Sequence, residues 1–361
     1  MAETWTIKRV LEWTEGYLGR RGEERPRLSA EWLLSAVTGL SRVELYVNYD
    51  RPLDPGELAR MHGLVARRAT GEPLQYVTGE MPFRHIVLRC EEGVLIPRPE
   101  TELLVEAALE GVDEAQRRHE AEEAEPAGGR AAGPDASDEV KAEASSDVEP
   151  GANSDGAGDV DGGVKVPDEV DEGSDADAAA SKEPPAPTAL VLEVGTGTGC
   201  IACSIASERP GARVVATDVS SQAIALATRN RDALGLEAGV DLVECDLASG
   251  VDEGLMGTFD VLVSNPPYIP SAVVPTLPRE VEGFEPHLAL DGGPDGNDVF
   301  RRLMDLAPRA LRPGGLFCVE LFEEGVAPAA QLLRDQGGWE RVEEREDYTH
   351  RPRFVVAWRE A

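Results

Sequence analysis

The chain has 361 residues, of which 41% are hydrophobic and 29% are charged, enough for two compact domains. Its 68 Asp and Glu residues outnumber 35 Lys and Arg, and the net charge of −33 argues against a protein that follows a nucleic-acid backbone, which needs basic faces. The N-terminus lacks the apolar segment of a secretory signal and no apolar run reaches membrane length, so we expect a cytoplasmic protein without membrane contact.

The first 78 residues are predicted to form a small helical domain. Apolar residues recur there at helical spacing, as at Ile7, Val10, Leu11 and Trp13, and residues 52–56 have the composition of a turn before another helix. Stripes of this kind pack into a core more often than they bind a partner. We therefore expect the helices to bury these side chains against one another.

A long acidic segment then interrupts the chain. Residues 111–190 contain 22 Asp or Glu against 6 Lys or Arg, and no Phe, Trp or Tyr. Such a composition buries too little apolar area to offset the entropy cost of ordering. We predict a disordered acidic insertion at about 110–187. It is compatible with a docking tail, a solubility device or a tolerated loop insertion without a dedicated role.

A glycine-rich turn follows the acidic segment. Residues 189–194 have a buried-strand pattern, three glycines come next at alternate positions, and residues 200–206 have a helical pattern. In a doubly wound α/β sheet, such a junction presents backbone N–H groups to a nucleotide-like ligand. The dinucleotide fingerprint has glycine where this chain has Cys200, so NAD is the weaker candidate for that ligand.

Acidic residues follow the next two predicted strands. Asp218 ends the strand at 213–217, 19 residues after the last glycine of the turn, where a carboxylate can accept ribose hydroxyls. Asp246 ends the strand at 240–245, where it can meet an adenine amino group while Leu247 packs on the ring. Either acid alone is more commonly a solvated loop residue. Acids at successive strand ends indicate a binding site.

The sequence Asn265-Pro266-Pro267-Tyr268 follows an apolar strand predicted at 259–263. An amide or exocyclic amine nitrogen has a delocalised lone pair and is a poor nucleophile. The Asn265 side chain and the Pro266 backbone carbonyl can accept its two hydrogens, the prolines fix the backbone, and Tyr268 offers an aromatic wall. The tetrapeptide alone is also compatible with a rigid turn. After a glycine turn, it indicates methyl transfer from S-adenosyl-L-methionine to a planar nitrogen.

Further blocks carry a resemblance to a known family. One runs from Gly71 to Gly79 and continues through Phe83 to the segment VLIPRPETE at 94–102, and another is LRPGG at 311–315. Together with the glycine turn and the Asn-Pro-Pro-Tyr sequence, they show that the chain resembles the HemK/PrmC family of release-factor glutamine methyltransferases. The resemblance covers nearly the whole chain apart from the insertion.

The resemblance implies an α/β fold of the class I S-adenosylmethionine-dependent methyltransferases, with a Rossmann-like, seven-stranded mixed sheet. It implies a helical substrate-docking domain at 1–78, a hairpin linker at 79–97 and a catalytic domain at 98–361. The implied reaction methylates the side-chain amide nitrogen, N5, of the glutamine in the Gly-Gly-Gln motif of peptide chain release factors. We expect a monomer that needs no direct contact with nucleic acid.

The resemblance also assigns the site residues. Those expected to bind the cofactor are Gly195, Thr196, Gly197, Thr198, Gly199, Asp218, Asp246, Leu247 and Asn265. Those expected to be catalytic and to hold the substrate amide are Asn265, Pro266, Pro267 and Tyr268, with Arg98 and Glu100 as further substrate contacts. No metal is expected, because the five cysteines are scattered and Cys200 and Cys203 lack a second pair for a zinc site.

Two alternatives stay open. A nucleic-acid adenine N6-methyltransferase can use the same tetrapeptide on an exocyclic amine, but it needs a flipped-base pocket beside a basic channel. The acidic charge and the block at 71–102 speak against it. A non-catalytic protein that keeps the fold and its cofactor-binding function is disfavoured by the intact Asn265 and by all three glycines of the turn.

Overall fold

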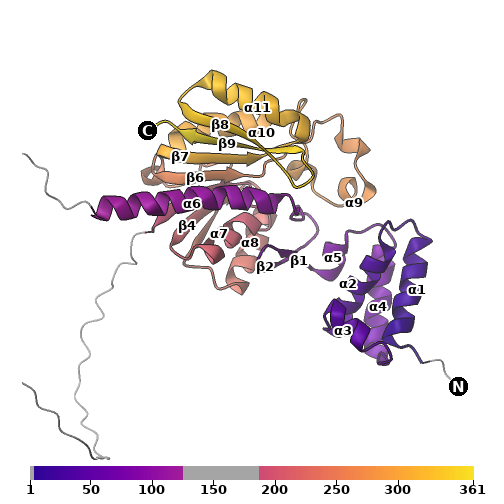
Figure 1. Ribbon diagram of the computed structural model, residues 1–361. Coiled ribbons are helices and arrows are strands. Elements are labelled where there is room, and N and C mark those ends of the chain that lie inside the picture. Colours follow the sequence, from indigo (N-terminus) through magenta and orange to yellow (C-terminus); the bar gives the residue numbers. More distant parts are fainter. Residues whose placement is uncertain (1–3, 125–186) are drawn as a thin grey trace, which may run out of the picture. The chain divides into compact units, whose positions relative to one another are not determined.

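The computed structural model describes residues 4–124 and 187–361, whose helices and strands are labelled in Figure 1. Five helices come first in the chain. Thr6 caps the first of them, and Asp54 and Glu57 form a capping box at the start of the fourth. The five are α1 (Ile7–Gly19), α2 (Pro26–Thr38), α3 (Arg42–Val47), α4 (Pro55–Arg68) and α5 (Leu74–Thr78).

The apolar stripes of these helices meet in one core. Ile7, Leu11 and Leu33 are completely buried there, in a cluster that also includes residues of α3 and α4. These residues are therefore core, as predicted, whereas Trp13 of the same stripe is 44% exposed and stacks on Tyr17. A short antiparallel hairpin follows, made of β1 (Glu80–Phe83) and β2 (Ile86–Arg89).

Helix α6 (Thr101–Ala124) extends well into the segment predicted to be an insertion. Its residues Leu104 and Val112 are completely buried in the core beneath the sheet. The prediction that the insertion starts at about 110 is therefore wrong, because apolar residues that pack on the sheet continue the helix past that point. Residues 125–186 of the predicted insertion lie outside the described residues.

Seven strands form one mixed sheet, in the order β5-β4-β3-β6-β7-β9-β8. Strand β9 is antiparallel to both of its neighbours, and the remaining pairs are parallel. The strands are β3 (Ala189–Val194), β4 (Ala212–Asp218), β5 (Val240–Glu244), β6 (Phe259–Ser264), β7 (Leu311–Glu320), β8 (Trp339–Glu346) and β9 (Pro352–Arg359). The predicted seven-stranded α/β sheet is confirmed.

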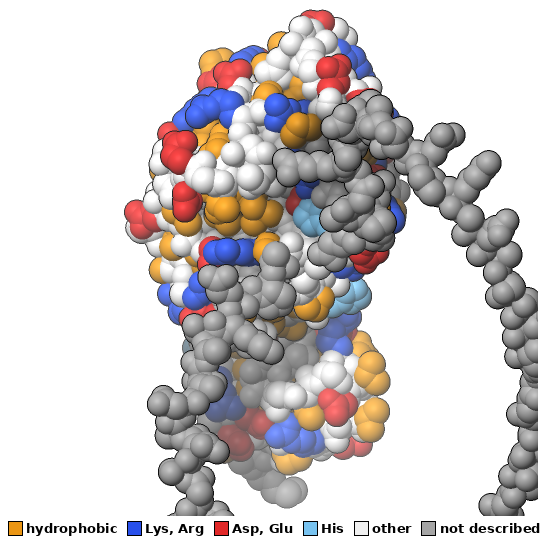
Figure 2. Space-filling model, turned by 90° about the vertical axis from the view of Figure 1, so that its left-hand side faces the viewer, with side chains coloured by type: hydrophobic (Ala, Val, Ile, Leu, Met, Phe, Trp, Pro, Cys, Tyr) orange, Lys and Arg blue, Asp and Glu red, His pale blue; other side chains and the backbone are white. Residues whose placement is uncertain are grey.

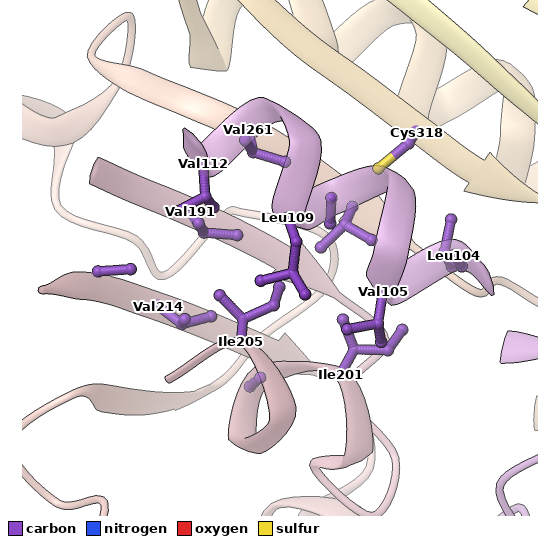
Figure 3. Close-up of a cluster of buried hydrophobic side chains, with 14 of the residues drawn as sticks. Leu104, Val105, Leu109, Val112, Val191, Ile201, Ile205, Val214, Val261 and Cys318 are labelled. Atoms are coloured by element: carbon purple, nitrogen blue, oxygen red, sulfur yellow. The ribbon is translucent and has the colours of Figure 1, made fainter. Parts of the chain in front are cut away.

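Helices cover both faces of this sheet (Figure 1). On one face α6 and α7 pack together on the strands, and Figure 3 shows Leu109 of α6 and Ile205 of α7 beside Val214 of β4. On the other face, α10 and α11 enclose a second cluster. None of the described helices is both long and apolar enough to cross a membrane. The later helices are α7 (Cys200–Glu208), α8 (Ser221–Ala233), α9 (Arg279–Glu282), α10 (Asp298–Ala310) and α11 (Glu323–Gln336).

The parallel strands end at a common edge of the sheet. The register pairs Val194 of β3 with Thr217 of β4 on one side and with Ser264 of β6 on the other. The segments that follow, namely the glycine turn, Asp218 and Asn265, therefore meet at the carboxyl edge. Open α/β sheets bind their ligands at this edge.

Candidate active site

The loop between β3 and α7 has a conformation that favours glycine. Gly195, Gly197 and Gly199 have φ angles of +77°, +56° and +82°. The backbone N–H groups of Gly195 and Thr196 both donate to the carbonyl of Thr217, at 2.8 and 2.9 Å. These bonds fix the turn to the end of β4, so the ends of the two strands form one rigid surface.

Asp218 is the last residue of β4, and its carboxylate forms a hydrogen bond with the glycine turn. Its Oδ2 accepts from the Gly197 N–H at 2.9 Å, and its Oδ1 accepts from the Ser220 N–H at 2.9 Å. Burial raises the pKa of this carboxyl above its ordinary value, while the backbone hydrogen bonds oppose the rise. Each carboxylate oxygen can accept more than one hydrogen bond, so Asp218 can also receive hydroxyl groups of a ligand.

The segment after β5 is held in an unusual backbone conformation. Leu247 has a φ of +51°, which is uncommon for a residue with a side chain. Its carbonyl accepts from Thr217 Oγ1 at 2.6 Å, which ties this segment to β4. Beside it, Arg302 Nη2 donates to Asp246 Oδ2 at 2.6 Å. This ion pair links α10 to the segment after β5 at the protein surface, where both side chains are exposed.

Asn265 lies directly after β6, beside the glycine turn. Its Nδ2 donates to Thr101 Oγ1 at 3.0 Å. Its Oδ1 is buried and has no hydrogen-bond partner among the described residues. A buried polar group without a partner costs about 1–3 kcal/mol. The site therefore fits a ligand that brings an N–H group to this oxygen.

A cavity of about 440 Å³ lies at this edge of the sheet. Its lining combines apolar side chains with a few polar groups, as is typical of small-molecule sites. The structure adds Val94 and Leu95, which precede α6, and Val299 and Arg302 of α10. The predicted site residues that the cavity brings together are Gly195, Gly197, Asp218, Asp246, Leu247, Asn265, Pro266 and Pro267.

Other predicted site residues do not line this cavity. The hydroxyl of Tyr268 donates to Glu320 Oε1 at 3.1 Å. Arg98 Nη2 donates to Glu285 Oε2 at 2.5 Å, and both residues line a larger cavity of about 560 Å³. Direct ligand contacts stay predictions for all of the predicted site residues, whether or not they line the first cavity. The predicted residues outside that cavity are Thr196, Thr198, Gly199, Tyr268, Arg98 and Glu100.

Glu193 lies completely buried under the glycine turn and is not predicted as a site residue. Its Oε2 accepts from Thr196 Oγ1 at 2.8 Å and from the Ala202 N–H at 3.0 Å. Its Oε1 has no partner within the described ranges. Burial raises the pKa of Glu193 to about 8, against the opposing effect of both hydrogen bonds. The one feature of the sequence that could have indicated this buried carboxyl is the position of an acidic residue within an otherwise apolar strand.

The raised pKa of Glu193 predicts a pH-dependent stability. A carboxyl group whose pKa is higher in the folded than in the unfolded state makes its full contribution to stability below the pKa of the unfolded state. This contribution is lost as the pH rises through the pKa of the folded state. For Glu193 this window runs from 4.5 to about 8. Glu193→Gln keeps the size and cannot ionise. We expect the free energy of unfolding of this variant to fall less steeply than that of the wild type as the pH rises across the window. The two slopes should differ by at most about 1.4 kcal/mol per pH unit.

Denaturant unfolding of the wild type and Glu193→Gln at several pH values checks this expectation. Glu340→Gln, which changes an exposed carboxylate, is the matched control and should follow the wild type. Parallel curves for the wild type and Glu193→Gln would contradict the assignment of a raised pKa.

Two further residues reach the site without having been predicted there. Thr101 begins α6 and Glu320 ends β7, and each is 1% exposed. Thr101 Oγ1 donates to Glu320 Oε2 at 2.8 Å. Burial raises the pKa of Glu320 to about 7, opposed by the hydrogen bonds from Thr101 and Tyr268. The acid at the end of a buried strand is the signal that points to Glu320.

The fold and the site together define a class of enzyme. A glycine turn after β3, an acid at the end of β4 and an Asn-Pro-Pro-Tyr loop after β6 meet at one cavity at the carboxyl edge of a mixed sheet. This arrangement is that of a class I S-adenosylmethionine-dependent methyltransferase.

Comparison with known proteins identifies the family. Residues 9–79 match the model of the PrmC N-terminal domain, and residues 160–276 match that of the methyltransferase small domain. The release factor glutamine methyltransferase of Geobacter sulfurreducens is 38% identical over 92% of this chain and 88% of its own length. The protein of the same name from Moorella thermoacetica is 33% identical over 98% of this chain and 99% of its own length. The chain belongs to the family of release factor glutamine methyltransferases.

Proposed function

We propose that this enzyme transfers a methyl group from S-adenosylmethionine to N5 of the glutamine in the Gly-Gly-Gln motif of peptide chain release factors. The observation that carries the proposal is Asn265, which lines the cavity and whose buried Oδ1 has no donor among the described residues. A primary amide supplies such a donor. The names of the relatives support a release factor as the substrate, which would locate the reaction in the cytoplasm.

The substrate nitrogen needs acceptors because its lone pair is delocalised into the neighbouring carbonyl. Bound S-adenosylmethionine supplies an electrophilic methyl group. The Asn265 Oδ1 and the Pro266 carbonyl accept the two amide hydrogens, which orients the nitrogen and stabilises the positive charge that forms on it. Pro267 restricts the backbone that carries these acceptors, and Tyr268 anchors it through Glu320. The proton can leave to water, so no general base is required.

The cofactor is proposed to lie along the ends of β3, β4 and β5. Asp218 would accept the ribose hydroxyls, and Asp246 would accept from the adenine amino group, with Leu247 against the ring. All three residues line the same cavity as the glycine turn. Thr196, Thr198 and Gly199 then act by shaping the turn.

The release factor is proposed to dock on the helical region at residues 1–78. The match of residues 9–79 to the PrmC N-terminal domain supports a role that is particular to this family. Arg98 and Glu100 lie between that region and α6 in the chain. Arg98 lines the larger cavity, which fits a contact with a protein substrate.

Both alternatives have less support. An adenine methyltransferase needs a basic channel for nucleic acid. The net charge of the chain is −33, and Figure 2 shows acidic and basic side chains interspersed over the visible described surface. A non-catalytic protein would have no need of a polar oxygen held without a partner at the cavity.

Methyl transfer from labelled S-adenosylmethionine tests the proposed function. The acceptors are a purified bacterial release factor, the same factor with its Gly-Gly-Gln glutamine replaced, and adenine-containing nucleic acid. We expect label on the intact factor alone. Label on nucleic acid would favour the adenine alternative, and binding of the cofactor without any transfer would favour the non-catalytic one.

A further inference from the structure

We propose that Thr101 and Glu320 are positioning residues that determine which end of the Asn265 amide is offered to the substrate. This inference rests on the proposed function of Asn265 as the acceptor of a substrate N–H. The two ends of an asparagine amide have almost the same shape, so packing alone discriminates poorly between them. Only the hydrogen bonds around the amide can set its orientation.

The hydrogen bonds that connect Asn265 through Thr101 to Glu320 all have the same direction, with Glu320 as the final acceptor. Both oxygens of Glu320 accept: Oε2 from Thr101 Oγ1 at 2.8 Å and Oε1 from the Tyr268 hydroxyl at 3.1 Å. Two accepting oxygens are what an ionised carboxylate provides, and Glu320 takes this form above its raised pKa of about 7. The single hydroxyl proton of Thr101 is thereby committed to Glu320.

The remaining capacity of the Thr101 hydroxyl is that of an acceptor. Asn265 Nδ2 donates to it at 3.0 Å. The reversed amide would turn Oδ1 toward a hydroxyl that has no proton to give it, and would leave the NH₂ group where the substrate amide must donate. Glu320 therefore acts on Asn265 through Thr101, and keeps Oδ1 as the acceptor.

Burial strengthens the effect of these hydrogen bonds on the orientation of the Asn265 amide. Thr101 and Glu320 are each 1% exposed, so bulk water does not compete for their hydrogen bonds. The three groups come from α6, β7 and the loop after β6, which the fold alone brings together. Glu320 also anchors Tyr268, so one carboxylate holds both ends of the Asn-Pro-Pro-Tyr sequence.

A matched pair of variants at Thr101 tests the inference. Thr101→Val keeps the shape and removes the hydroxyl, whereas Thr101→Ser keeps the hydroxyl. With a release factor as substrate, we expect kcat to fall at least fivefold in Thr101→Val, with the affinity for S-adenosylmethionine within twofold of the wild type. We expect Thr101→Ser to keep at least half of the wild-type kcat. Unchanged kcat in Thr101→Val, or an equal loss in Thr101→Ser, would overturn the inference.

The side-chain NH₂ signal of Asn265 provides a readout that needs no turnover. It is assigned in NMR spectra by its loss in Asn265→Ala. We expect its exchange with solvent to be at least tenfold faster in Thr101→Val than in the wild type and Thr101→Ser. Equal exchange in all three would refute the positioning role, even if the wild type proved inactive on release factors. Inactive wild type with the expected exchange pattern would instead refute the proposed function alone.

Glu320→Gln tests whether Glu320 acts on Asn265 through Thr101. This variant also provides the test if Thr101→Val does not fold. Its side chain offers one accepting oxygen where the carboxylate offers two. We therefore expect kcat to fall at least threefold and the Asn265 NH₂ group to exchange faster than in the wild type. Wild-type values of both quantities would show that Glu320 does not act on Asn265.

Discussion

Replacing Asn265 by alanine is expected to lower the turnover number at least tenfold while the affinity for S-adenosylmethionine stays within about twofold. The Asn265 Oδ1 is buried and has no partner among the described residues, so it is placed to accept from a substrate N–H. A hydrogen bond aimed at charge that develops in a desolvated site contributes more than about 1.4 kcal/mol to the barrier, which corresponds to a factor of ten in rate. Single-turnover methylation of a release factor, with calorimetric cofactor titration, measures both quantities.

Asn48→Ala is a suitable control, because Asn48 caps the end of α3 and lines neither of the two cavities described above. It should leave turnover unchanged. Full turnover in Asn265→Ala would exclude the amide clamp. A large loss of cofactor affinity in that variant would mean that Asn265 acts mainly in binding the cofactor.

Replacing Asp218 by alanine is expected to weaken the binding of S-adenosylmethionine at least tenfold. The carboxylate lines the cavity and holds the N–H groups of Gly197 and Ser220, so its loss removes a ligand contact and loosens the turn. Hydrogen bonds to a charged group contribute about 1.5–3 kcal/mol, which is a factor of about ten to one hundred in affinity. Calorimetric titration of the cofactor measures this change.

Asp241→Ala is the matched control for this experiment. Asp241 is also an acid of the sheet, but it pairs with Arg213 at 2.7 Å and does not line the cavity. Its removal should leave the affinity for the cofactor within about twofold of the wild type. Equal affinities in Asp218→Ala and Asp241→Ala would remove Asp218 from the cofactor site.

The elements around the cavity are the most predictable part of this protein. The apolar run before the glycines predicts β3, and the structure has it at the same residues, 189–194. The strand predicted at 259–263 is observed as β6 (Phe259–Ser264). Such strands are covered by helices on both faces, so their sequence is a continuous apolar run that is easily recognised.

Helix α6 shows that composition alone does not locate the boundary between a helix and the acidic segment that follows it. Counting charges over residues 111–190 places the start of the insertion within this helix, although Val112 and Ala115 are completely buried. A window of that length averages the last turns of an amphipathic helix with the acidic residues that follow. The side of the helix that meets the sheet is decided by packing, which composition does not record.

The sequence by itself determined the order of strands, turns and acids, and hence the class of site, because local periodicity and glycine positions are properties of short segments. Only the tertiary structure decided which partners complete that site. Asn265 meets Thr101, 164 residues earlier in the chain, and Thr101 meets Glu320, 219 residues later. Glu193 likewise acquires its raised pKa only when the turn and α7 bury it. Contacts across such separations depend on how the sheet is assembled, and burial then decides the protonation and hydrogen bonding of the groups that meet.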